Sequence, residues 1–228
     1  MKKIMKKKVL GMATIPSRIE TLEIVLKRIY NQVDIIELSL NGFKKIPFFL
    51  NKYEKVICNL TSNKMGDANK FFNIDKYENC YYFSCDDDIL YPNNYITTYI
   101  NYIDRYKSLI TSHGSIIPKS NINSYYKDRI MKSHCLKKTK EEIVHIPGSG
   151  VSGFDTSIVE IKYSMFKKRN MSDIFLGIEC KKQNIKCISI KHDEGWIQGG
   201  LNENRKTIYE DAKDNDQEQT KLINSIKW

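Results

Sequence analysis

Short apolar runs that suit β-strands alternate with amphipathic stretches that suit α-helices through the first half of this 228-residue chain. Such alternation favours an α/β fold, because a chain must cross back over the sheet before two successive strands can pair in parallel. We therefore expect a mostly parallel central sheet with helices on both faces. The expected strands span 9–13, 35–40, 55–60, 81–85 and 109–112, and the expected helices span 17–30, 67–74 and 95–106.

The second half of the chain is less regular, but its pattern still predicts elements of the same kind. A strand is expected over 143–146 and another over 185–190, with helices over 156–166 and 172–183 and a charged helical segment from 204. Ser17 and Glu20 have the spacing of a capping box, which predicts that the first helix begins at Ser17. With no internal repeat and no low-complexity linker, we expect one domain over 1–228.

Three consecutive aspartates, Asp86, Asp87 and Asp88, follow the buried strand expected over 81–85. Side chains alternate along an extended chain, so Asp86 and Asp88 point the same way while the chain stays extended, and Asp87 points away. Paired carboxylates at a strand end suit a hard divalent cation, which in turn suits a diphosphate. The alternative is an acidic turn, because the following segment 91–94 has turn chemistry, but three adjacent like charges need a cation or strong donors beside them.

Two other predicted strands also end in polar segments. Residues 14–18 follow the first strand, and Asn41 and Gly42 follow the second. In an open α/β sheet, ligands bind outside the carboxyl ends of the strands. We therefore expect these segments and the aspartates to share one rim.

Composition limits the partners and the environment. Hydrophobic residues make up 41% of the chain, which supports a packed core, and the mean hydropathy of −0.48 argues against a membrane-embedded protein. The net charge is +10, but the lysines are spread along the chain, so we expect no nucleic-acid partner. Lysines within 2–8, together with the segment 221–228, suggest a weak contact with an inner-membrane surface. Without a signal-peptide pattern we expect a cytoplasmic protein whose six cysteines stay reduced, and no CxxC spacing indicates a zinc site.

The order of the motifs resembles that of a known enzyme family. Thr14-Ile15-Pro16-Ser17-Arg18, Asn41-Gly42, Gly66-Asp67-Ala68-Asn69-Lys70-Phe71, Asp86-Asp87-Asp88 and Met171-Ser172-Asp173 follow one another as in GT-A glycosyltransferases. The likeness is greatest to bacterial enzymes of glycosyltransferase family 2 type that build capsule, lipooligosaccharide or other surface polysaccharides. It implies a Rossmann-like, three-layer GT-A fold, with a nucleotide-binding half over 8–112, an acceptor half over 113–200 and a helical tail over 201–228.

The resemblance also implies an activity and a set of site residues. A member of this family moves a sugar from a nucleotide-sugar donor, usually UDP-linked, to a hydroxyl of a glycan or lipid-linked glycan acceptor, with Mn²⁺ or Mg²⁺. By position, the donor nucleotide would be bordered by Thr14, Pro16, Arg18, Asn41, Asp67, Lys70, Asp86 and Asp87. Asp86 and Asp88 match the family's DXD motif and would contact ribose and metal. His192, after the strand expected over 185–190, is a candidate third metal ligand, although a lone loop histidine is more often only a polar residue.

Asp173 is the residue that the resemblance implies as the catalytic base of an inverting enzyme. A carboxylate can assist removal of the proton from the attacking hydroxyl. The alternative is that Asp173 only stabilises the start of its helix through the helix dipole, and Glu179 is then the other candidate base.

A competing motif lies over 148–153, where Gly148, Gly150 and Gly153 form a literal GxGxxG. This pattern suggests an NAD-dependent oxidoreductase, provided that a helix follows the glycines and Asp173 closes a second strand. The stretch before Asp173 has no strand pattern, so we expect instead a flexible loop near the acceptor. A non-catalytic, metal-dependent sugar- or nucleotide-binding protein is the third possibility, since binding needs no base.

Overall fold

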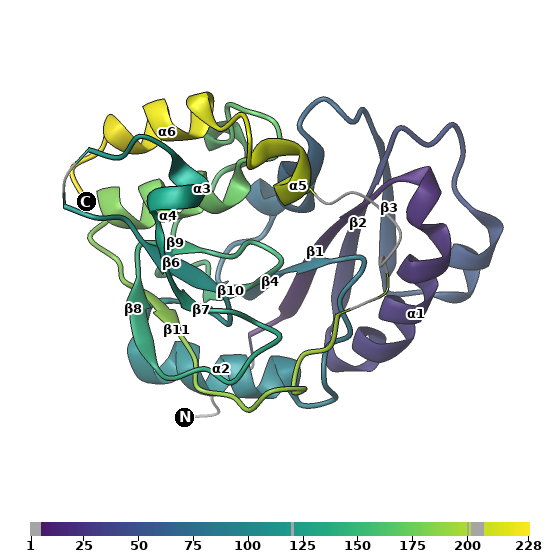
Figure 1. Cartoon of the computed structure of the whole chain (residues 1–228). Coiled ribbons are helices and arrows are strands. Elements are labelled where there is room, and N and C mark those ends of the chain that lie inside the picture. Colours follow the sequence, from purple (N-terminus) through teal and green to yellow (C-terminus); the bar gives the residue numbers. More distant parts are fainter. Residues whose placement is uncertain (1–5, 120, 200, 202–207) are drawn as a thin grey trace.

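The computed structural model describes residues 6–119, 121–199, 201 and 208–228. A central sheet of eight strands crosses this part of the chain in the order β3-β2-β1-β4-β10-β5-β11-β8 (Figure 1). The strands are β1 (Lys8–Thr14), β2 (Ile35–Asn41), β3 (Val56–Thr61), β4 (Tyr81–Asp86), β5 (Leu109–Thr111), β8 (Glu142–Val144), β10 (Val151–Asp155) and β11 (Cys187–Ser189). Strands β1 to β4 pair in parallel, as do β5 and β11, whereas β10 and β8 run antiparallel to their neighbours.

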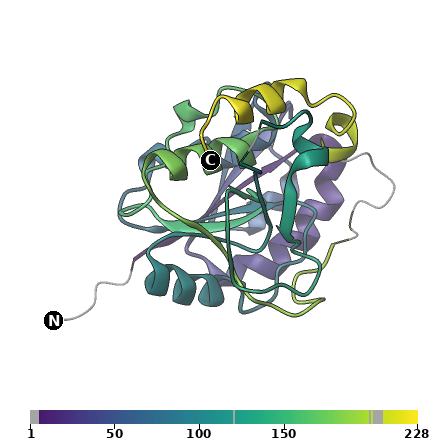
Figure 2. The same ribbon diagram turned by 60° about the vertical axis from the view of Figure 1, so that its left-hand side comes forward.

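Helices cover both faces of this sheet. On one face, α1 (Ile19–Ile29) and α2 (Tyr95–Tyr106) pack their apolar stripes against side chains such as Leu10 and Phe83. On the other face, α4 (Ser172–Lys182) and α6 (Gln217–Asn224) lie side by side and share a core with Tyr82 and Phe154 (Figures 1 and 2). The expected three-layer α/β fold with a mostly parallel sheet is therefore confirmed.

A small second sheet lies over the end of the central one. Within the described residues it contains β7 (Ile130–Ser133), β6 (Gly114–Ile116) and β9 (Ile146–Pro147), all paired antiparallel. The short helix α3 (Tyr125–Asp128) precedes β7 and packs against α6, while α5 (Ile208–Ala212) precedes α6. None of the helices in the described part of the chain is long and apolar enough to cross a membrane.

Three expectations about local structure are wrong, each for a packing reason. Helix α1 has Arg18 at its N-cap and no side-chain capping bond, because Pro16–Arg18 forms a separate 3-10 turn. Gly66–Phe71 is also a 3-10 turn, since four successive side chains from position 68 are buried and no single helical face could bury them all. No α-helix forms over 156–166, where the only helical turn is a 3-10 turn at Tyr163–Met165; burial at Val159 and Ile161 follows the two-residue period of extended chain.

The glycine-rich segment over 148–153 also differs from the expectation. Its second half enters β10, which is buried between β4 and β5, and the backbone of Gly153 lies against Phe83 and Tyr99. The expected flexible loop is therefore limited to the residues before Val151. No helix follows the glycines, so the strand-glycine-helix geometry that a dinucleotide fingerprint requires is absent here.

Candidate functional site

A cavity of about 420 Å³ opens at the carboxyl ends of β1, β2 and β4. Thr14, Asn41 and Asp86, the last residues of these strands, all line it. The rim expected from the strand ends therefore exists. The second half of the chain supplies the rest of the lining, from the loop before β10, the start of α4, and α3 with the residues that follow it.

The three aspartates line the cavity, and side-chain cations hold each of them. Asp86, at the end of β4, is paired with Lys70. The chain turns immediately afterwards, so Asp87 and Asp88 do not alternate; both reach Arg18, with N–O distances of 2.9 and 3.2 Å. Arg18 and Lys70 thus supply the cations that three adjacent carboxylates need.

Burial makes two of the cavity's carboxylates unusual acids. Asp87 is only 1% exposed, and burial raises its pKa to about 6 although Arg18 acts in the opposite direction. Burial likewise raises the pKa of Asp67 to about 6, against the influence of Lys70 and of a hydrogen bond from the Ser172 hydroxyl. Within the described part of the chain, Oδ2 of Asp87 and Oδ1 of Asp67 have no hydrogen-bond partner.

Lys70 is the most deeply buried cation of the site, with a side chain that is 3% exposed. Burial alone would lower its pKa, but the carboxylates of Asp86 and Asp67 outweigh that effect and raise it. Its ammonium group also lies 3.5 Å from the hydroxyl of Ser149, which bonds to Ser172 at 2.8 Å. The network therefore links the 3-10 turn, the end of β4 and the start of α4.

Asp173 lies in the first turn of α4 and lines the cavity. Its Oδ1 accepts the backbone N–H of Ser149 at 2.7 Å, and α4 has no side-chain capping bond. The carboxylate thus bonds the glycine-rich loop, and its place in the first turn of α4 is also one where the helix dipole favours an acidic side chain. Glu179, the other candidate base, is not among the cavity's lining residues and is bonded to Lys182 and Gln183.

Glycines let the backbone approach the aspartates closely. A Cβ atom at Gly150 would overlap the carboxylate of Asp86, and one at Gly148 would lie 2.8 Å from the Cβ of His113. The glycine-rich segment therefore serves as the wall of the cavity beside the carboxylates.

The remaining predicted site residues have different surroundings. The buried hydroxyl of Thr14 interacts with Asp87 and acts to lower the pKa of that carboxyl. Asn41 lines the cavity, but its amide bonds Gly66 and Asn69, so it fixes the 3-10 turn. Pro16 and His192 are not among the lining residues. His192 packs on Trp196, with ring centroids 5.3 Å apart, and the structure does not bring it together with the aspartates.

Sequence reasoning missed several residues that line the cavity. They are His113, Tyr125, Tyr126, Arg129, Arg169 and Asn170. Burial lowers the pKa of His113 to about 4, so its imidazole is neutral at neutral pH. The segments that carry these residues have no regular hydrophobic period, and no motif marked them as neighbours of the strand ends.

Comparisons with known proteins identify the fold. Neither a protein-family model nor a curated protein matches this chain. The solved structure of Staphylococcus aureus TarS 1-349 in complex with UDP-GlcNAc is similar, with a TM-score of 0.56 and 11% sequence identity over 91% of this chain and 63% of that one. TarS 1-349 in complex with UDP has a TM-score of 0.54 and 12% identity over 83% of this chain and 59% of that one. This chain thus spans less than two thirds of these neighbours and shares their GT-A-like glycosyltransferase fold.

The cavity's residues fit a divalent cation chemically. Asp86 and Asp88 place carboxylate oxygens at its wall, which are ligands that Mn²⁺ and Mg²⁺ prefer. Of the described residues that line the cavity, five are aspartates and four are arginine or lysine, so these cations do not exceed the carboxylates in number. A bound diphosphate would add negative charge that a further cation would have to offset.

The raised pKa of Asp67 predicts how stability depends on pH. An unfolded aspartate has a pKa near 3.9, so between about pH 4 and pH 6 the folded chain holds a proton that the unfolded chain has lost. Asp67 should therefore lower the free energy of unfolding as pH rises through this window, by on the order of 2 to 3 kcal/mol. In Asp67→Asn this contribution should vanish. Urea denaturation at several pH values measures it; the exposed Asp75→Asn should behave like the wild type, and an unchanged slope in Asp67→Asn would contradict the prediction.

Proposed function

We propose that this protein is a glycosyltransferase that moves a sugar from a nucleotide-sugar donor, UDP-linked, to a hydroxyl of a glycan acceptor in bacterial surface polysaccharide synthesis. The observation that carries the proposal is the cavity at the strand ends, whose lining includes Asp86, Asp87, Asp88 and Asp173. The shared fold with TarS, whose structures contain UDP and UDP-GlcNAc, supports a nucleotide sugar as the donor.

The donor half of the site would work mainly through charge. Arg18 and Lys70 hold the aspartates in place by ion pairs, and the cavity beside them would accept the donor's ribose and diphosphate. Asp86 and Asp88 would hold Mn²⁺ or Mg²⁺, which when bound stabilises the negative charge of a leaving diphosphate. The buried Oδ1 of Asp67, which has no hydrogen-bond partner among the described residues, is a further candidate to bond the nucleotide.

Asp173 would act as the general base. The backbone N–H of Ser149 bonds its Oδ1, so Oδ2 would receive the proton of the acceptor hydroxyl. Such assistance contributes roughly 10²- to 10⁴-fold to rate. A direct displacement with one base would invert the configuration at the anomeric carbon, so we propose an inverting reaction.

Asp173→Asn tests the base directly. An amide keeps the oxygen that accepts the Ser149 N–H but cannot take a proton, so kcat should fall by roughly 10²- to 10⁴-fold while UDP binding stays unchanged. An assay of sugar transfer from UDP-sugar donors to a glycan acceptor measures kcat. Titration calorimetry with UDP measures binding. Glu179→Gln, on the same helix but outside the cavity lining, is the matched control and should retain activity. If Asp173→Asn keeps its kcat, Asp173 is not the base.

Asp88→Ala tests the metal. UDP should raise the melting temperature of the wild type by a few degrees in the presence of Mn²⁺, because ligand at a hundred times its dissociation constant stabilises by about 2.7 kcal/mol. This Mn²⁺-dependent shift should be lost in Asp88→Ala. An equal shift in the variant would contradict the assignment, and a shift with NADH instead of UDP would favour the oxidoreductase. Binding of UDP without any transfer by the wild type would favour a binding protein.

We also propose a contact with an anionic membrane surface, but at a different place from the termini. Lys6 and Lys8 form ion pairs with Asp155 and Asp34, and the apolar residues near the C-terminus pack inward, with Ile223 fully buried. Lys2 and Lys3 belong to residues 1–5, which lie outside the described part of the chain.

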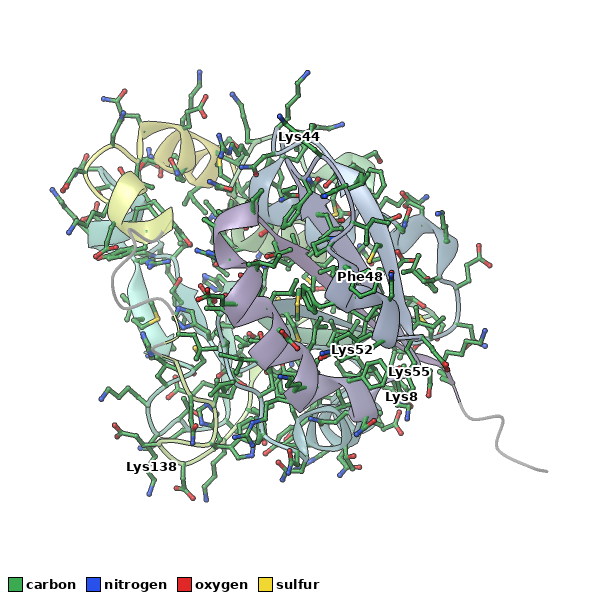
Figure 3. The ribbon with its side chains drawn as sticks, turned by 90° about the vertical axis from the view of Figure 1, so that its right-hand side faces the viewer. Lys8, Lys44, Phe48, Lys52, Lys55 and Lys138 are labelled. Carbon is green, nitrogen blue, oxygen red and sulfur yellow. The ribbon has the colours of Figure 1, made fainter. Side chains whose placement is uncertain are left out.

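The loop before β3 has the surface that such a contact needs. Phe48 is 87% exposed, and in Figure 3 it lies between Lys44 and Lys52 on the outer side of the molecule. Lys45 and Ile46 beside it are also exposed. Lys52 forms an ion pair with Glu23 at 2.6 Å, so Lys44 and Lys45 would attract anionic lipids while the exposed ring enters the headgroup region.

Phe48→Ser should weaken binding to vesicles that contain anionic phospholipid by about tenfold, because insertion of a phenyl ring is worth roughly 1.5 kcal/mol or more. Cosedimentation with such vesicles, and with neutral phosphatidylcholine vesicles for comparison, measures the effect. Phe72→Ser changes a partly exposed phenyl group on another part of the chain and should bind as the wild type does. Equal binding by Phe48→Ser and wild type would exclude this loop as the contact.

A further inference from the structure

Three side chains with metal-binding atoms meet on the wall of the cavity, apart from the aspartates. They are His113, His134 and Cys135, and one ligand atom from each lies within 4.8 Å of the others. His113 and Cys135 line the cavity, whereas His134 is exposed. The proposed transfer reaction gives none of them a role.

The small sheet builds this cluster. Strands β6 and β7 pair antiparallel with Gly114 opposite Ser133, so the residues just beyond that pair, His113 and His134, face each other across the ladder. Their ring centroids are 5.0 Å apart. On the other side of His113 the chain has Gly148, where a Cβ atom would lie 2.8 Å from the Cβ of His113. The positions of the two rings therefore follow from strand register and close backbone packing.

The ligand atoms are available. Within the described structure, the ring nitrogens of His113 take part in none of the hydrogen bonds. His134 accepts the backbone N–H of Leu136 at Nδ1 over 3.3 Å, so Nδ1 carries the lone pair, and a metal would bind it in place of this long hydrogen bond. Cys135 is a free thiol, 8% exposed, with its sulfur inside the cluster.

The charges around the cluster are mixed. The carboxylates of Asp173 and Asp86 act electrostatically on both His113 and Cys135, which favours a cation there. Arg129 acts on His113 and Lys137 on His134 in the opposite sense. A divalent cation would thus have two carboxylates near it that are not its own ligands.

We propose that His113, His134 and Cys135 bind Zn²⁺, with a fourth coordination position open to the cavity. Two imidazoles and a thiolate suit zinc, and select it over the Mn²⁺ or Mg²⁺ proposed for the aspartates. Ligand atoms around tetrahedral zinc are roughly 3.3 to 3.8 Å apart, so small side-chain rotations from the present separation suffice. On binding, the thiol of Cys135 loses its proton to solvent and its sulfur bonds the metal. The open position would hold water or an oxygen of a molecule in the cavity, beside Asp173. This proposal does not rest on the transferase activity.

Cobalt(II) tests the site without any assay of activity. Co²⁺ added to the metal-stripped full-length protein should give a thiolate-to-cobalt charge-transfer band that saturates at one equivalent, and Zn²⁺ should abolish it by displacement. Cys135→Ser should lack the band. His134→Gln should bind Co²⁺ at least tenfold more weakly, and because His134 is exposed this variant should fold normally.

Two controls separate this site from the others. Cys58→Ser removes a half-buried thiol in β3 and should keep the band. Asp88→Ala should also keep it, so a failure of the proposed metal site at the aspartates would leave this result unaffected. Absence of a charge-transfer band in the wild type, or an unchanged band in Cys135→Ser, overturns the zinc site.

Discussion

The ion pairs of Lys70 with Asp86 and of Arg18 with Asp87 are the interactions on which the rest of the site depends. They join the end of β4 to the 3-10 turn and to the start of α1, three segments that are far apart in sequence. A buried charge without a partner would destabilise the folded chain, so each residue of a pair fixes the position of the other. The pKa values of Asp67 and Asp87 are still raised, so the nearby cations Lys70 and Arg18 offset only part of the effect of burial on these carboxyls.

The antiparallel strand β10 brings the second half of the chain to this charged edge. It pairs with β4 and β5, and the loop before it places the backbone of Gly150 against Asp86 and the N–H of Ser149 on Asp173. The wall that faces the aspartates thus depends on the same sheet that positions them. The proposed transfer requires that donor and acceptor meet in one cavity. A donor at the aspartates and an acceptor at Asp173 would do so.

The same wall carries the cluster of His113, His134 and Cys135, held by the register of the small sheet. Two kinds of metal-binding chemistry, hard carboxylates and softer nitrogen and sulfur, would therefore lie at different parts of one cavity. The two groups differ chemically, because the metals that they prefer differ. A search for CxxC would not find the proposed zinc site, since His113 precedes β6, His134 and Cys135 follow β7, and only the last two are adjacent in sequence.

Sequence alone determined the parallel half of the sheet, the helices α1, α2 and α4, and the strand-end positions of Thr14, Asn41 and the aspartates, because hydrophobic period and turn chemistry are local properties. It did not predict the 3-10 turn at Gly66–Phe71, the extended chain after Asp155 or the insertion of β10, because burial on several sides overrode local preference. Only the tertiary structure decided that Arg18 and Lys70 neutralise the aspartates, that Asn41 bonds the turn, and that His192 lies elsewhere. Those outcomes depend on which distant side chains meet, and a one-dimensional pattern does not contain that information.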